Sequence, residues 1–225
     1  MMYGYDSAYL LIVLVSMVLG YITQGYINKA YNKWSQVPTS LPGTGADVAR
    51  RMLDSNGAGA VGITQIAGRL TDNYDPRDNK LHLSADNYTK GSVASVAVAC
   101  HEAGHAIQNA TGYGLMRLRT SLVPAVTFAS QTWVLLLMGG YMFNMFGLVR
   151  LAIAAFGMTV LFHLVTLPVE IDASRRAVQY LGTVSEIDQA GAREVLTAAA
   201  LTYVAAALSS ILQLMYYASR TRRRD

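Results

Sequence analysis

The sequence predicts a mainly α-helical membrane protein with three to four transmembrane helices and one small α+β domain. Hydrophobic residues make up 52% of the 225 residues and charged residues only 14%, whereas ordinary soluble domains carry about 25% charged residues. Four long stretches contain no Asp, Glu, Lys or Arg: residues 7–28, 120–149, 151–169 and 195–219. Each approaches or exceeds the roughly 20 residues that a helix needs to cross a bilayer. Only residues 29–119 form a long polar stretch, and a soluble chain with four buried helices is therefore disfavoured.

The apolar stretches predict the membrane segments. Residues 7–28 are expected to be a retained transmembrane anchor, because no basic residue precedes them and no convincing small-residue cleavage site follows them. Residues 120–169 predict a transmembrane helical hairpin. After the hairpin we expect a helical segment over residues 170–194, an apolar and membrane-spanning helix over residues 195–219, and a basic tail over residues 220–225.

The polar stretch after the anchor predicts a small mixed domain. Thr44 has the properties of an N-cap, and Asp47 stands at the position that completes a capping box. The helix that they begin is expected to end at Asn56. Residues 61–66 alternate weakly between apolar and polar side chains, and residues 80–84 alternate clearly. We therefore expect a two- or three-stranded sheet, followed by a helix that contains the next motif.

That motif is His-Glu-x-x-His at residues 101–105. Residues four apart lie on one face of a helix, about one turn from each other, so His101 and His105 can bind one tetrahedral Zn²⁺. Glu102 is then placed to reach a water on the metal rather than the metal itself. The pattern also occurs by chance, with histidines that only form hydrogen bonds. However, Gly104 lowers helix stability and is better explained by a close approach of another backbone or of the metal site. The motif therefore predicts a zincin-like catalytic domain with one zinc ion.

A catalytic zinc site needs a third protein ligand. The remaining histidines and the downstream carboxylates are the candidates: His82, His163, Glu170, Asp172, Glu186, Asp188 and Glu194. The third ligand must lie on the same side of the membrane as the first two, so an even number of crossings must separate them. The predicted hairpin supplies two crossings and returns the chain at Glu170, beside the membrane surface. We therefore expect Glu170 to be the third ligand, although an interfacial charge at a helix end is the simpler interpretation.

Residues 98–108 and 167–177, which surround these positions, resemble the YugP-type membrane zinc metallopeptidases. Residues 70–77 and 200–208 resemble the same family, so the resemblance covers nearly the whole chain. It implies a membrane-bound zinc peptidase. Family members commonly have His where this chain has Asn73, and the resemblance does not extend to that position.

The order of the elements is more distantly similar to HtpX and the CAAX-prenyl proteases. These proteases place two membrane helices between HExxH and a Glu ligand in a Glu-x-x-Ala-Asp context. This chain keeps Glu170 and Ala173 but has Ser174 in place of the Asp. Such an Asp orients a ligand histidine, and here Asp172 or Asp75 could substitute for it. The similarity also implies a role in membrane protein quality control.

These residues imply hydrolysis of peptide bonds in a protein or peptide substrate. Zinc held by His101, His105 and Glu170 would activate a water, and Glu102 would take its proton and later deliver it to the leaving amine. A donor that stabilises the oxyanion is also required. The candidates for that donor are Tyr203, Tyr74, Arg175 and His163.

Two alternative functions are considered. One is a non-catalytic zinc-binding membrane scaffold or chaperone, but a structural metal site has no need of a base such as Glu102. The other is an intramembrane protease of the site-2 type, but its Asp-Gly ligand motif in a later span is missing. We expect a protein or peptide substrate and the lipid bilayer as partners, and no nucleic acid. The oligomeric state stays open.

The distribution of basic residues predicts a multi-pass protein of the cell membrane with its catalytic domain in the cytoplasm. Ten of the eighteen Lys and Arg residues lie within 29–119, and three more lie within 175–193. The positive-inside rule places both stretches in the cytoplasm. If residues 195–219 also cross, the basic tail lies outside, against the rule; otherwise the last helix packs beside the catalytic domain without crossing.

Overall fold

The computed structural model describes residues 6–222, so Met1–Tyr5 and the last three residues of the predicted basic tail lie outside the described part. Its elements in chain order are α1 (Ser7–Ser35), α2 (Gly45–Ser55), β1 (Gly62–Ile66), β2 (Asn73–Asp75), β3 (Lys80–Ser84), α3 (Ala85–Thr89), α4 (Val93–Ala110), α5 (Gly114–Met142), α6 (Phe146–Gly182) and α7 (Glu186–Arg222). The chain forms two compact units. Unit 1 comprises Met1–Ile22, Leu118–Leu167 and Thr202–Asp225, and unit 2 comprises Thr23–Arg117 and Pro168–Leu201.

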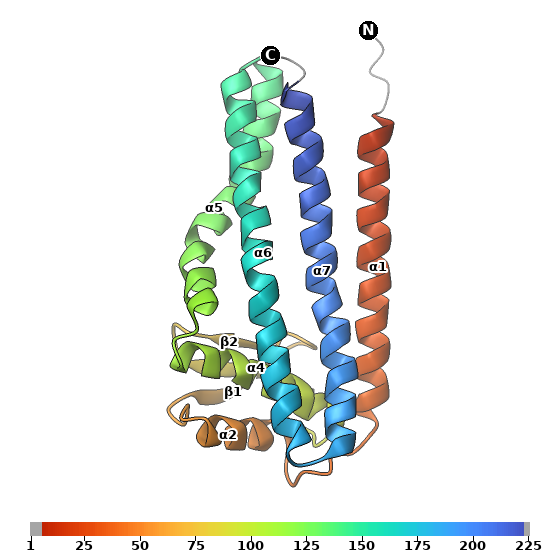
Figure 1. The fold of residues 1–225 in the computed structure, drawn as a ribbon, viewed down its shortest axis with the longest axis vertical. Helices are drawn as coiled ribbons and strands as arrows, with labels where there is room; N and C mark the ends of the chain where they lie inside the picture. The colour runs from red at the N-terminus through yellow and green to blue at the C-terminus, as the bar shows by residue number, and fades with distance from the viewer. Residues whose placement is uncertain (1–5, 223–225) are drawn as a thin grey trace. The chain divides into compact units, whose positions relative to one another are not determined.

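The prediction of a mainly α-helical membrane protein with a small sheet is confirmed. Four helices are long and apolar enough to cross a bilayer: α1, α5, α6 and α7 over Glu186–Thr221 (Figure 1). Helix α6 continues through Pro168 to Gly182, although a proline removes one helical hydrogen bond. The helical segment expected over residues 170–194 is therefore not one element: its first part belongs to α6, which ends at Gly182, and its last part to α7, which begins at Glu186.

Unit 1 contains the most apolar parts of the four long helices, and large apolar side chains lie on its surface. Among the most exposed are Leu11, Met17, Phe128, Leu135, Met138 and Met142. Such a surface is unusual for a soluble protein but fits a lipid environment, in which helices satisfy their backbone hydrogen bonds internally.

Helices α1 and α7 run antiparallel. In unit 1 the start of α1 lies beside the end of α7, because the Tyr216 hydroxyl donates a 2.6 Å hydrogen bond to Asp6. In unit 2 the end of α1 lies beside the start of α7, where Lys33 pairs with Glu194 at 2.6 Å. If both helices cross a bilayer, they cross it in opposite directions.

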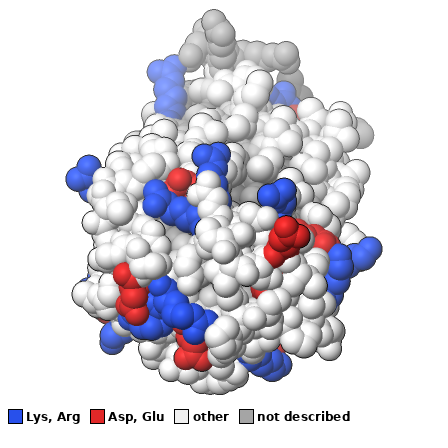
Figure 2. All heavy atoms as spheres, turned by 60° about the horizontal axis from the view of Figure 1, so that its bottom comes forward, with Lys and Arg blue, Asp and Glu red and all other residues white. Residues whose placement is uncertain are grey.

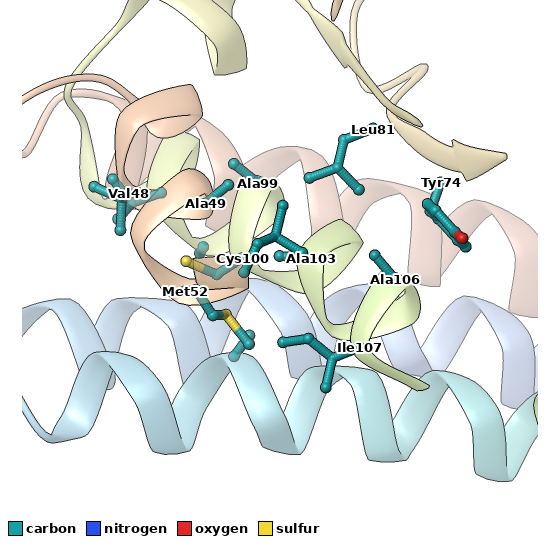
Figure 3. Packing of buried hydrophobic residues seen from close by; sticks show 14 of the residues in the cluster. Val48, Ala49, Met52, Tyr74, Leu81, Ala99, Cys100, Ala103, Ala106 and Ile107 are labelled. Atoms are coloured by element: carbon teal, nitrogen blue, oxygen red, sulfur yellow. The ribbon is translucent and has the colours of Figure 1, made fainter. Parts of the chain in front are cut away.

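Helix α4 forms the centre of the core of unit 2. Ala99, Ala103 and Ala106 on α4 are small and fully buried, which lets neighbouring elements approach the helix closely. Figure 3 shows Met52 of α2 and Leu81 of β3 packed around this helix. An Ala-rich helix buried on nearly all sides is a rigid support for the side chains that it carries.

A three-stranded sheet with strand order β1-β3-β2 adjoins α4. Strand β1 pairs with β3 in parallel, Gly62 opposite Lys80, and β2 pairs with β3 antiparallel, Tyr74 opposite Leu81. The expected sheet is thus found with three strands. Side chains of both charge signs lie interspersed over the face of unit 2 that is turned forward in Figure 2.

The predicted capping box is also found at the start of α2. The Thr44 side chain accepts a hydrogen bond from the Asp47 backbone N–H, and the Asp47 carboxylate accepts one from the Thr44 N–H. These two bonds satisfy donors that every helix start leaves without a partner. Helix α2 ends at Ser55 with Asn56 as its C-cap.

Candidate metal centre

The two motif histidines lie on the side of α4 that faces α6. Ser92 caps the helix, since its side chain accepts a hydrogen bond from the Ser95 N–H. A Cβ added to Gly104 would lie 2.8 Å from the backbone oxygen of Ala173 and 3.1 Å from its Cα. Only glycine allows the backbones of α4 and α6 to come this close. The expected close approach at Gly104 is therefore confirmed.

This contact brings Glu170 of α6 to the two histidines. His101 Nε2 lies 3.2 Å from Glu170 Oε2, and His105 Nε2 lies 3.4 Å from the same oxygen. The candidate ligand atoms of the three residues all lie within 4.8 Å of one another. Within residues 6–222, they are the single group of three or more His, Cys, Asp or Glu side chains that could hold one metal ion.

The donor set fits a zinc ion. Two imidazoles and one carboxylate are the three protein ligands of one class of catalytic zinc site. Glu170 is only 1% exposed, and a buried carboxylate is costly unless a cation or hydrogen bonds compensate it. A divalent cation among the three side chains would provide this compensation, with both Nε2 atoms already directed towards it.

A buried amide supports His105 from behind. Gln108 Oε1 lies 3.0 Å from His105 Nδ1, and Gln108 Nε2 donates to the Val169 carbonyl at 2.8 Å and to Asp172 Oδ2 at 2.9 Å. Arg176 Nε donates to the same Asp172 oxygen at 2.7 Å. Because both amide hydrogens of Gln108 are used, its oxygen must accept a hydrogen bond from His105 Nδ1–H. The lone pair on His105 Nε2 is then free for a metal.

His101 has a simpler support. Ser174 Oγ lies 3.1 Å from His101 Nδ1, so the serine at the position of the Asp in HtpX-like proteases contacts the histidine itself. Asp172 contacts neither histidine directly and acts through Gln108. Asp75, the other expected substitute, is hydrogen-bonded to Arg77, which lowers the pKa of its carboxyl to about 2.

Three of the other carboxylates and histidines considered as third ligands have different partners. His82 Nε2 lies 3.1 Å from Asp78, and Glu194 accepts hydrogen bonds from Lys33 and Trp34. Buried Asp188 accepts hydrogen bonds from the Thr39 hydroxyl and the Ser40 N–H. His163 belongs to unit 1, and Glu186 lies exposed at the start of α7.

The structure places the predicted catalytic base and oxyanion donors as follows. Glu102 lies on α4 next to His101 and is buried, with 7% exposure. The Tyr74 hydroxyl donates to Asn79 at 2.9 Å and accepts from Asn109, near the end of α4, at 2.9 Å. Arg175 lies exposed on α6 one turn beyond the site, and Tyr203 belongs to unit 1.

Sequence reasoning missed Gln108 and the direct contact of Ser174. Helical spacing carried a signal for both, because Gln108 follows His105 by three positions and Ser174 follows Glu170 by four.

Comparisons with known proteins agree with this arrangement. Residues 9–222 match a family described as "Putative neutral zinc metallopeptidase". The chain is also 39% identical over 212 residues to a protein of Bacillus subtilis (strain 168) named "Putative membrane protease YugP". The aligned region covers 93% of this chain and 94% of that protein. No solved structure matches the chain significantly. The resemblance indicated by the sequence motifs is confirmed.

Proposed function

This chain belongs to the family described as "Putative neutral zinc metallopeptidase", and from this premise we propose that it is a membrane-embedded, zinc-dependent endopeptidase. The observation that supports this most is the convergence of His101, His105 and Glu170 within 4.8 Å, next to the buried carboxyl group of Glu102. We further propose one catalytic zinc ion per chain, protein or peptide substrates, and a role in membrane protein quality control.

The chain supplies each part of a hydrolytic mechanism except an assigned oxyanion donor. His101, His105 and Glu170 would hold the zinc, which when bound lowers the pKa of a water and polarises a carbonyl oxygen. Glu102 takes the proton of the attacking water and delivers it to the leaving amine. Gln108 keeps His105 in the tautomer that leaves Nε2 unprotonated, through its 3.0 Å contact with Nδ1.

The structure gives no support to the site-2 alternative. That alternative requires the HExxH helix to lie within the bilayer, and α4 is not among the four candidate spans of the described residues. Helix α4 instead packs against α2, the sheet and α6 inside unit 2. This packing supports a site in a polar domain beside the membrane.

The distribution of charge supports a cytoplasmic catalytic domain, and the antiparallel arrangement of α1 and α7 supports a fourth crossing. The end of α7 then lies outside, where the positive-inside rule disfavours its arginines. There Arg220 forms an ion pair with Asp6, which neutralises one of these positive charges. We expect a tag after residue 225 to be digested by protease added to intact cells, and a tag in the polar domain to be protected. Protection of both tags would contradict the fourth crossing.

A Glu102→Gln variant separates the endopeptidase from a zinc-binding scaffold. The amide keeps the shape of the side chain but cannot accept a proton, so we expect a loss of turnover of at least 10²-fold with zinc content unchanged. Turnover is measured with fluorescently labelled, unfolded casein and the detergent-purified protein. The matched control is Glu186→Gln, which changes an exposed carboxylate at the start of α7 and should leave turnover unaltered. Equal turnover in wild type and Glu102→Gln would contradict the proposed mechanism.

A further inference from the structure

A groove lies between α6 and α7 in unit 2, with a cavity volume of about 280 Å³. Ile171 and Val178 of α6 and Leu196 of α7 contribute apolar lining, and the side chains of Arg175 and Arg193, one from each helix, border the groove. The groove therefore has an apolar surface with two exposed arginines at its border, which suits a ligand that is both apolar and anionic.

Neither arginine has a carboxylate of its own among the described residues: Asp172 attracts Arg175 but forms its ion pair with Arg176. The neighbouring carboxylates in the sequence are engaged elsewhere, since Asp172 pairs with Arg176 at 2.7 Å and Glu194 pairs with Lys33 at 2.6 Å. Among residues 6–222, no ion pair includes Arg175 or Arg193. Both side chains are exposed, so an external anion can reach them.

The groove also lies at the level where the membrane helices become polar. The charge-free stretch of α6 ends at Val169, and that of α7 begins at Val195. At a rise of about 1.5 Å per residue, Arg175 and Arg193 lie within about 9 Å of these boundaries along their helices. Arginine side chains at such positions extend towards lipid headgroups, and basic pockets between membrane helices bind anionic headgroups.

The position of Ser174 separates the groove from the expected path of a substrate. Ser174 lines the groove, and its hydroxyl contacts His101 on the Nδ1 side at 3.1 Å. His101 Nε2 instead faces Glu170. A substrate carbonyl must approach the metal on the Nε2 side, whereas Ser174 connects the groove to the Nδ1 side of the imidazole.

We propose that this groove binds one anionic phospholipid, with the phosphate between Arg175 and Arg193 and an acyl chain along Ile171 and Leu196. The proposal goes beyond the proteolytic function and does not depend on it. Through Ser174, the bound lipid lies one hydrogen bond from His101, so it contacts the support of the metal site.

The test is native mass spectrometry of the detergent-purified, full-length protein with phosphatidylglycerol or phosphatidylcholine added. We expect wild type to retain phosphatidylglycerol roughly tenfold better than phosphatidylcholine, and the double variant Arg175→Gln/Arg193→Gln to lose this preference. The matched control is Lys29→Gln/Arg117→Gln, which removes two basic residues beside other charge-free stretches and should keep the preference. Thermal unfolding and zinc content equal to wild type show that the groove variant is folded.

Three outcomes would overturn the proposal. The first is equal retention of both lipids by wild type, and the second is an unchanged preference in the folded groove variant. The third is displacement of phosphatidylglycerol by millimolar inorganic phosphate, which would identify a site for a free anion. If the groove variant kept its lipid preference but lost casein cleavage, the groove would belong to the peptide substrate instead.

Discussion

The two sides of the candidate metal centre are built differently. Behind His105, the fully buried amide of Gln108 joins the imidazole to the Val169 carbonyl and to Asp172. Behind His101 there is a single hydroxyl, that of Ser174, in a half-buried position that also borders the groove between α6 and α7. Gln108 can satisfy its hydrogen bonds in only one way, so its contact with His105 has a fixed direction. The Ser174 hydroxyl can donate to His101 or accept from it.

The difference shows how the two ligands contribute to the site. The Gln108 amide can only accept from His105 because both of its hydrogens are donated elsewhere, so the tautomer of His105 is determined. A hydroxyl can donate or accept, so Ser174 does not determine the tautomer of His101 by itself. We therefore expect His105 to be the preorganised ligand and His101 to be the ligand that responds to its surroundings.

The largest expected effect comes from Gly104→Ala, which disturbs both supports together. The new Cβ would lie 2.8 Å from the Ala173 oxygen, so α4 and α6 must separate. We expect a loss of about 1–3 kcal/mol in the free energy of unfolding and a lower zinc content, measured by thermal unfolding and elemental analysis. The control is Gly157→Ala in α6, where a Cβ would meet nothing within 4 Å. Full zinc content and unchanged unfolding in Gly104→Ala would contradict the close packing.

Next in size is Gln108→Ala, which removes only the support of His105. Loss of such a partner typically lowers metal affinity or activity by about 10- to 100-fold, and it leaves Asp172 and the Val169 carbonyl without this buried donor. Zinc affinity is measured by competition with a chelating dye. Gln179→Ala, at an exposed position on α6, serves as the control. An affinity within about twofold of wild type would remove the distinction between the two histidines.

A smaller effect is expected for Ser174→Ala, a few-fold loss of zinc affinity, because water can replace an accessible hydroxyl. Ser174→Asp sharpens the comparison, since a carboxylate accepts a stronger hydrogen bond from His101 Nδ1–H. We expect Ser174→Asp to bind zinc more tightly than wild type in the same competition assay. If Ser174→Ala cost as much as Gln108→Ala, the two supports would be equivalent.

The smallest effect on zinc is expected for Thr44→Ala, far along the chain from both supports. Loss of the cap should lower the free energy of unfolding by about 1 kcal/mol, because the Asp47 N–H loses its side-chain acceptor. Zinc affinity should not change, since α2 contributes no residue to the site. A matching loss of zinc affinity would mean that the site depends on general stability rather than on its own supports.

Much of the fold could be predicted because the relevant signals are local. Charge-free stretches of sufficient length predict spanning helices, and Thr44 with Asp47 predicts the start of α2. The convergence of His101, His105 and Glu170 could be anticipated from helical spacing and from the number of membrane crossings. The reason for Gly104 could also be anticipated, as the position of Ala173 confirms.

The remaining features depend on tertiary geometry. Ser174 contacts His101, and Gln108 donates to the Val169 carbonyl and Asp172, only because this face of α6 is turned towards α4. Asp75, expected as a substitute for the missing Asp, instead accepts hydrogen bonds from Arg77, two residues later. The continuation of α6 through Pro168 into the fully buried Val169 is likewise not indicated by the local sequence, since proline removes a helical hydrogen bond.

The central claim is that His101, His105 and Glu170 hold one zinc ion, and the most direct measurement is zinc per protein in detergent-purified wild type and Glu170→Ala. The account predicts about one zinc ion per chain in wild type and a clear loss in the variant, since three protein ligands are needed. About one zinc ion in both proteins would contradict Glu170 as a ligand. No zinc in either protein, even after reconstitution with the metal, would contradict the zinc site itself.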